Sequence, residues 1–139
     1  MNRSQSREEG FKLLYSLQLM NDNDEAEQTE MFLKEEGIAD EEAIKYIKNV
    51  INGIKLNNDE IEKQIKDNIK DEWTISRISK IDLTLLKLGI YEILYSKLPY
   101  KVVINEVVEL SKAYGDDNSK AFVNGVLASI VKKNNISQE

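Results

Sequence analysis

The spacing of apolar residues limits most strongly what this chain can fold into. Along most of its 139 residues, apolar side chains recur every three or four positions, the period of an α-helix with one buried face. Glycine is scarce, with six residues, and Pro99 is the only proline, so few positions would interrupt a helix. The sequence therefore predicts an all-α protein.

Breaks in this pattern divide the chain into about seven helices. Gly37 and Gly115 are suited to end helices, Asp40 to cap one and Pro99 to begin one. The short loops favour antiparallel neighbours, so we expect one compact domain over residues 1–139. The expected helices run from about Arg3 to Met20, Asp24 to Glu36, Asp40 to Ile54, Ile61 to Ile69, Asp82 to Leu94, Pro99 to Tyr114 and Asn118 to Val131.

The segment that follows Trp73 predicts a central helix with a broad apolar band. Trp73 itself is expected in a connection, where its ring would fill the space between two helical groups. Asp82 suits the N-cap or the first turn of the central helix. Gly89 lies in mid-helix, where glycine is about 1 kcal/mol less favourable than alanine, so we expect another helix to approach closely there.

The composition excludes several kinds of chemistry. The chain has no cysteine and no histidine, which removes disulfides, thiol and imidazole metal ligands, and histidine acid–base catalysis. We therefore expect no metal and no cofactor. No run of about 18 apolar residues is present, and the first residues lack the apolar core of a signal peptide. A cytoplasmic protein without a membrane segment is the resulting prediction.

The net charge of −6 is unevenly distributed. Residues 1–20 carry +1, residues 21–42 carry −9 and residues 43–139 carry +2. Because salt screens charges over about 8 Å, RNA responds to local potential, and the two ends of the chain can still form a mildly basic face. The acidic segment is most simply a solvated helix surface, and its role stays open.

Two groups of residues are candidates for contact with RNA. Arg3 and Arg7 lie one turn apart near the start of the first helix, and Lys12 follows; phosphate would suit these cations, although an ordinary charged helix end explains them too. Ser119 and Lys120 begin the last helix, where free N–H groups attract anions.

Phe122, in the same last helix, has two interpretations. Its ring is suited to stack on an unpaired base, as aromatic side chains do in proteins that bind single-stranded RNA. Its helical spacing is equally typical of a core residue, and by periodicity alone the core is the simpler explanation.

Glu106 and Glu109 are the most plausible pair of catalytic carboxylates, but they lack the surroundings of an active site. No metal ligands and no glycine-rich phosphate loop accompany them. We expect them to form hydrogen bonds that fix the register of their helix, and we expect no enzyme activity and no catalytic residue.

Three segments in the second half of the chain resemble the NusB family in order and spacing: IDLTLLKLGIYEILY, PYKVVINEVVELSKAYG and SKAFVNGVL. The segment REEGFKLLYSLQL resembles the opening helix of that family. The resemblance implies two packed helical subdomains. It also implies an RNA-binding transcription antitermination factor that binds boxA in nascent ribosomal transcripts with the ribosomal protein NusE, within the RNA polymerase antitermination complex.

The same resemblance assigns residues. It implies RNA contacts by Arg3, Arg7, Lys12, Ser119, Lys120 and Phe122. It places Tyr15 and Asp82 on the surface that binds NusE, and it allows a homodimer that covers the RNA face. The N-terminal arm has fewer arginines than many members have, so tight RNA binding without NusE is not expected.

The sequence leaves two alternative functions. A NusB-like domain also precedes the catalytic domain of some RNA cytosine methyltransferases, but this chain has no cysteine nucleophile and no glycine-rich cofactor loop. A helical adaptor or homodimer without an RNA role is the second alternative, and only a binding experiment separates it from an RNA-binding factor.

Overall fold

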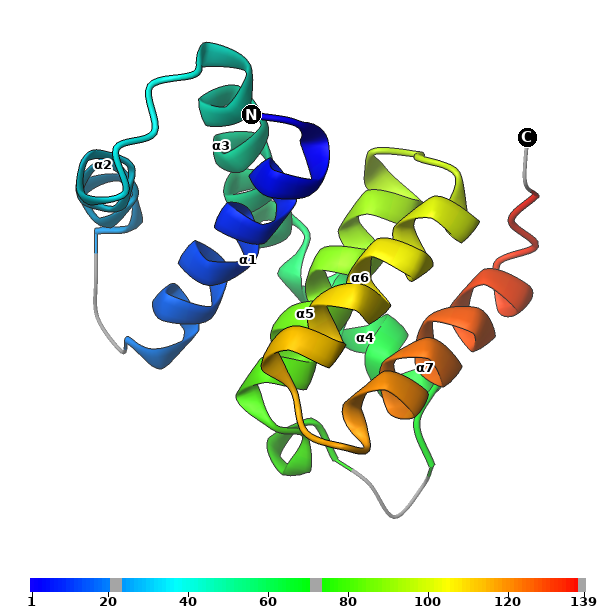
Figure 1. The fold of residues 1–139 in the computed structure, drawn as a ribbon. Coiled ribbons are helices and arrows are strands. Elements are labelled where there is room, and N and C mark those ends of the chain that lie inside the picture. The colour runs from blue at the N-terminus through cyan, green and yellow to red at the C-terminus, as the bar shows by residue number, and fades with distance from the viewer. Residues whose placement is uncertain (21–23, 71–73, 138–139) are drawn as a thin grey trace.

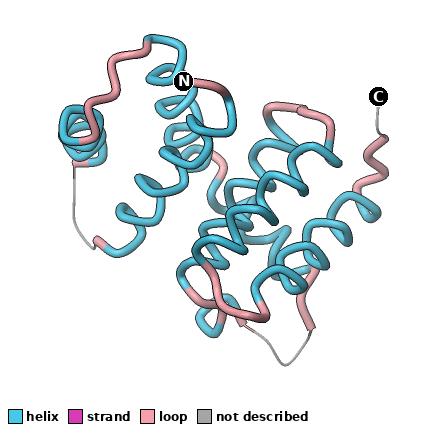
Figure 2. Tube along the Cα trace, viewed as in Figure 1, coloured by secondary structure: helices cyan, strands magenta, loops and turns pink. Residues whose placement is uncertain are grey.

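Seven α-helices account for most of residues 1–20, 24–70 and 74–137, which are the residues that the computed structural model describes (Figures 1 and 2). No strand occurs among them, and the predicted all-α class is confirmed. Trp73 lies outside the described residues. The helices are α1 (Arg3–Leu19), α2 (Glu25–Glu35), α3 (Glu41–Leu56), α4 (Asn58–Asp67), α5 (Lys80–Ile90), α6 (Tyr100–Tyr114) and α7 (Ser119–Lys133), with a 3₁₀ turn η1 (Ile75–Arg77) and a π-helical segment η2 (Tyr91–Tyr95).

Side-chain caps set the starts of several helices. Asn2 and Gln5 form a reciprocal capping box at α1, with N–H to side-chain oxygen distances of 2.8 and 2.9 Å. Asp40 caps α3, as predicted. Ser79 caps α5 by accepting a hydrogen bond from the Asp82 N–H at 3.1 Å, so Asp82 is the first-turn acid and not the cap.

The helices form two groups that pack against each other. Figure 1 shows α1, α2 and α3 on the left and α4 to α7 on the right. Contacts of α1 with α5, and of α3 with α5 and η2, join the groups. This arrangement confirms the two packed helical subdomains that the family resemblance implied.

Helix α5 is the central element. It packs against α1, α4, α6 and α7, and each of its residues from Asp82 to Ile90 is buried. A Cβ atom added to Gly89 would lie 2.9 Å from Leu127 Cδ1 of α7, which confirms the predicted close approach. None of the helices in the described part of the chain is long and apolar enough to span a membrane.

Candidate nucleic-acid interface

Arg3, the first residue of α1, is exposed and lies over an aromatic ring. Its guanidinium carbon is 4.5 Å from the centroid of the Tyr46 ring on α3, which is a cation–π contact. No ion pair of Arg3 with a carboxylate occurs among residues 1–20, 24–70 and 74–137, so its charge remains available to a ligand.

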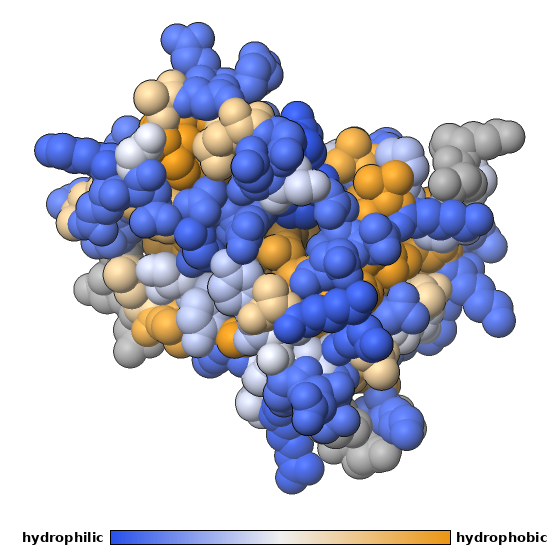
Figure 3. Space-filling view, viewed as in Figure 1, coloured by the Kyte–Doolittle hydropathy of each residue, from blue (hydrophilic) through white to orange (hydrophobic). Residues whose placement is uncertain are grey.

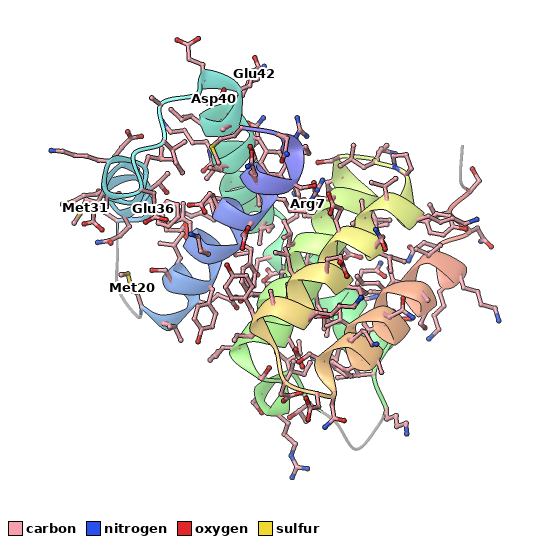
Figure 4. The ribbon with its side chains drawn as sticks, viewed as in Figure 1. Arg7, Met20, Met31, Glu36, Asp40 and Glu42 are labelled. Atoms are coloured by element: carbon pink, nitrogen blue, oxygen red, sulfur yellow. The ribbon has the colours of Figure 1, made fainter. Side chains whose placement is uncertain are left out.

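Arg7, one turn further along α1, is an interior residue and only 2% exposed. Its Nε and Nη2 donate to Glu92 Oε1 and Oε2 at 2.6 and 3.2 Å, and its Nη1 donates to Glu106 Oε1 at 3.0 Å. Figure 4 shows Arg7 pointing from α1 towards the second helical group. The predicted RNA contact does not fit this placement, because the guanidinium is buried and already bound to two carboxylates.

The cluster around Arg7 fixes α1 against α3, η2 and α6. The Tyr46 hydroxyl donates to Glu92 Oε2 at 3.0 Å, and Glu92 is fully buried. Burial lowers the pKa of Arg7, but the hydrogen bond and charge of Glu92 outweigh it and leave this pKa above its ordinary value. Burial, and then the charge of Glu92, raise the pKa of Tyr46, so its hydroxyl remains a donor. Glu106 has the structural role predicted for it, but Glu109 does not, because its side chain is exposed and pairs with Lys112 on the same helix at 2.7 Å.

Lys12 is engaged with carboxylates of its own chain. Its Nζ lies 2.7 Å from Glu9 Oε2 and 3.0 Å from Glu36 Oε1, and so links α1 to the end of α2. The hydrogen bond to Glu9 raises the pKa of Lys12 above its ordinary value although burial opposes it. Lys12 is therefore charged but locally neutralised, which weakens its attraction for phosphate.

The start of α7 already holds an anionic group of the protein. Asp116 Oδ1 accepts hydrogen bonds from the N–H groups of Asn118 and Ser119 at 2.8 and 3.1 Å. Ser119 is 1% exposed, and its hydroxyl oxygen accepts from the Asp116 N–H at 3.0 Å. Two of the N–H groups expected to be free for phosphate are thus bound to Asp116.

Lys120 and Phe122 are the accessible members of this group. Lys120 is exposed, whereas Phe122 is half-buried and packs against the hydrophobic core. The core contact predicted for Phe122 is present, and its partial exposure leaves the RNA contact a prediction.

Asp82 lies beside the start of α7. It is 9% exposed, and its Oδ1 is buried without a hydrogen-bond partner among the described residues. Burial raises the pKa of the Asp82 carboxyl, although a hydrogen bond with Ser119 opposes this shift. Asp82 Oδ1 has almost no accessible surface, so its burial without a partner in the described part of the chain destabilises the fold.

Tyr15 lies half-buried on α1, with its ring 6.4 Å from that of Phe11. Gln18, one turn after Tyr15, donates to the hydroxyl of Thr84, which is two residues after Asp82. Tyr15 and Asp82 are therefore both close to the contact between α1 and α5.

The structure does not gather the predicted RNA-binding residues into one patch. Figure 1 shows the start of α1 and the start of α7 at opposite ends of the view. Figure 3 shows that hydrophilic side chains cover most of this face and that apolar side chains gather on the right, over α6 and α7. No group of three His, Cys, Asp or Glu side chains within the described ranges is placed to hold a metal ion.

The sequence suggested that Glu92 pairs with a cation of its own region, Arg77, Lys80 or Lys87. The structure pairs Glu92 with Arg7 instead, and the sequence did not point to Tyr46. A signal for Glu92 was present, because a lone carboxylate within the broad apolar band of the central segment needs a buried partner. Tyr46 gave no such signal, because a tyrosine on an amphipathic helix is typical of a core edge.

Comparison with known proteins identifies the family. The family model described as "NusB family" matches residues 4–132. The chain is 42% identical to the transcription antitermination protein NusB of Clostridium novyi, over 95% of this chain and 99% of that protein. The structure of T. maritima NusB superposes with a TM-score of 0.87 at 34% identity, covering 96% of this chain and 92% of that one.

A second solved structure contains partners. It is a crystal structure of the antitermination factors NusB and NusE in complex with double-stranded RNA. The chain matches it with a TM-score of 0.86 at 28% identity, over 94% of this chain and 96% of that one. These matches extend over almost the whole chain, and the chain therefore belongs to the NusB family.

Proposed function

We propose that residues 1–139 form one RNA-binding domain that acts as a transcription antitermination factor, together with NusE, on boxA in nascent ribosomal transcripts. The observation that carries this proposal is the near full-length match to a NusB that has been crystallised with NusE and RNA. The chain would act in the cytoplasm, within the RNA polymerase antitermination complex, and without enzyme activity.

The RNA surface in this proposal has two parts. Arg3 supplies an exposed guanidinium at the start of α1 that forms no ion pair with a carboxylate in the described part of the chain. Lys120 supplies a second exposed cation at the start of α7, and Phe122 lies close by with a half-buried ring. Few phosphate contacts give modest affinity that falls with salt, so a second protein that extends the surface would strengthen binding.

The NusE surface in this proposal lies around Tyr15 and Asp82. Tyr15 supports it, because its ring is half-buried on α1 and so partly accessible to a partner. A homodimer would instead cover the RNA face and would therefore compete with RNA.

Filter binding of a short boxA RNA, with and without NusE, tests the proposal. We expect weak, salt-sensitive binding by the chain alone and tighter binding with NusE. A scrambled RNA of the same length serves as the control for sequence preference. Absence of binding at low salt in both conditions would reject the RNA function and favour the helical adaptor.

A further inference from the structure

A cleft of about 290 Å³ lies between the start of α1, one face of α3 and the η2 region. The α3 face presents Glu42, Lys45, Tyr46 and Asn49, which share one side of the helix because they are three and four residues apart. Arg3 closes the cleft from α1. The cleft thus lies at the junction of the two helical groups, a common position for ligand sites.

The floor of the cleft is held rigidly. Tyr46 is 8% exposed, and its hydroxyl is bound to Glu92, which Arg7 neutralises. Gly53, one turn beyond Asn49, lets α3 and η2 approach closely, because a Cβ atom there would lie 2.1 Å from Tyr91 Cε1. The opposite wall includes the π-helical η2, and such segments are frequent at functional sites.

The rim of the cleft carries an excess of positive charge. Within the described ranges, neither Arg3 nor Lys45 forms an ion pair with a carboxylate, and both side chains are exposed. Of the described residues that line the cleft, Glu42 is the one acidic group at the rim, since the carboxylate of Glu92 is buried against Arg7. By contrast, Lys48, one turn further along α3, pairs with Glu30 at 2.6 Å. The cleft therefore favours an anionic ligand.

Arg3 also offers a surface for stacking. One side of its guanidinium lies over the Tyr46 ring, 4.5 Å from the centroid. Arginine planes are established stacking partners for unpaired RNA bases, and a guanidinium held on a ring is already ordered. Asn49 adds an amide that can both donate to and accept from a base edge.

We propose that this cleft binds one nucleotide, with its base on the outer side of the Arg3 guanidinium and its phosphate against Lys45. The volume of about 290 Å³ is at the lower end of ligand pockets, which span about 300–1,000 Å³, and so suits a single nucleotide rather than a longer strand. This inference rests on the proposed RNA function, because the nucleotide would belong to an RNA strand that continues from α1 onto α3. A free nucleoside monophosphate has the same chemistry, and the experiments below separate the two sources.

The phosphate contact is tested with two matched variants of the full chain, Lys45→Gln and Lys48→Gln. Each removes one positive charge from α3, but only Lys45 faces the cleft. For binding of a short single-stranded boxA RNA, we expect Lys45→Gln to reduce the slope of log K against log salt by about 0.7, the value for one phosphate of a single strand. Lys48→Gln should leave the slope unchanged. Equal slopes for both variants and the wild type would overturn the proposal.

The stacking contact is tested with Arg3→Lys and Arg3→Gln. If the guanidinium plane carries a base, both variants should bind RNA about 5- to 150-fold more weakly than the wild type, because lysine keeps the charge but not the plane. Rescue of wild-type affinity by lysine would show that Arg3 acts only as a charge and would contradict the stacked base.

Titration of the full chain with uridine 5′-monophosphate, and separately with boxA RNA, identifies the source of the nucleotide. Shifts of the Asn49 side-chain amide in NMR spectra with the mononucleotide would show that a free nucleotide enters the cleft, and shifts with RNA alone would show that the strand supplies it. No shift with either ligand, while Lys120→Gln still weakens RNA binding, would overturn the cleft but leave the proposed function. Shifts with the mononucleotide but no RNA binding, even with NusE, would overturn the proposed RNA function and leave the cleft as a site for a free nucleotide.

Discussion

Arg7 and Glu92 form an ion pair that is buried on both sides and joins α1 to the segment that follows α5. The side chains are 3% and 1% exposed, and the Nε to Oε1 distance is 2.6 Å. They are 85 residues apart in the chain. Arg7 also donates to Glu106, and Tyr46 donates to Glu92, so the cluster links four segments of the fold: α1, α3, η2 and α6.

Replacement of Arg7 should destabilise the protein strongly. Arg7→Ala leaves Glu92 buried without its cation, and breaking a buried pair in this way lowers the free energy of unfolding by about 3–5 kcal/mol. Arg3→Ala is the matched control, because Arg3 is exposed and its removal should lower that free energy by less than about 1 kcal/mol. Urea denaturation measures the free energy of unfolding of both variants. An equal loss in the two variants would contradict the buried ion pair.

Two glycines in helices should respond oppositely to alanine. In Gly53→Ala the new Cβ would lie 2.1 Å from the Tyr91 ring, so we expect overpacking that lowers the free energy of unfolding by about 1–3 kcal/mol. In Gly125→Ala the new Cβ would meet no atom within 4 Å, so the higher helix propensity of alanine should raise the free energy of unfolding by about 0.5–1 kcal/mol. Thermal melts of both variants test the close contact between α3 and η2; a neutral Gly53→Ala would argue against it.

The Asp82 carboxyl should make stability depend on pH. Because burial raises its pKa in the folded state, the folded protein binds the proton more tightly than the unfolded chain does. Asp82 therefore destabilises the fold above its folded pKa, and this effect diminishes as the pH falls to the unfolded value of about 3.9. Asp82→Asn should stabilise the protein at neutral pH by an amount that shrinks towards pH 4. A difference that does not change with pH would exclude this explanation.

Phe122 separates a core role from an RNA role. Phe122→Ala should weaken RNA binding by about 1–3 kcal/mol per folded molecule if the ring stacks on a base. Val123→Ala is the control, since Val123 is fully buried and should affect only stability. Affinities corrected for the folded fraction decide between the roles. Unchanged affinity with a lowered melting temperature in Phe122→Ala would leave the ring with a core role alone.

Tyr15 tests the surface proposed for NusE. Tyr15→Asp should prevent NusE from being retained in a pull-down while the circular dichroism spectrum stays helical, because a charge would replace the ring at the α1–α5 contact. Tyr95→Asp, on η2, is the control and should retain NusE. Retention of NusE by both variants would place its surface elsewhere.

The helices were predictable because their signals are local. Periodicity, the caps and Gly89 depend on residues within a few positions of one another, and the structure agrees with them. Arg7 was not predictable in this way. An arginine near the start of a charged helix is typical of a surface residue, and its partner Glu92 is brought beside it only by the packing of α1 on the second helical group.

The start of α7 shows the same limit at shorter range. The sequence indicated an anion-binding site at the N–H groups that begin this helix. In the structure, the Asp116 carboxylate accepts hydrogen bonds from two of these N–H groups. Whether a nearby acid caps a helix or leaves it open for a ligand depends on the backbone of the turn, which residue types alone do not specify.

The central claim, that this protein binds boxA RNA with NusE, is tested most directly by measuring its RNA affinity as a function of NusE concentration. We predict that the dissociation constant for boxA RNA falls as NusE is added and reaches a plateau at one NusE per chain, while a scrambled RNA gains little. An affinity for boxA RNA that does not change with NusE, or an equal gain for the scrambled RNA, would contradict the account.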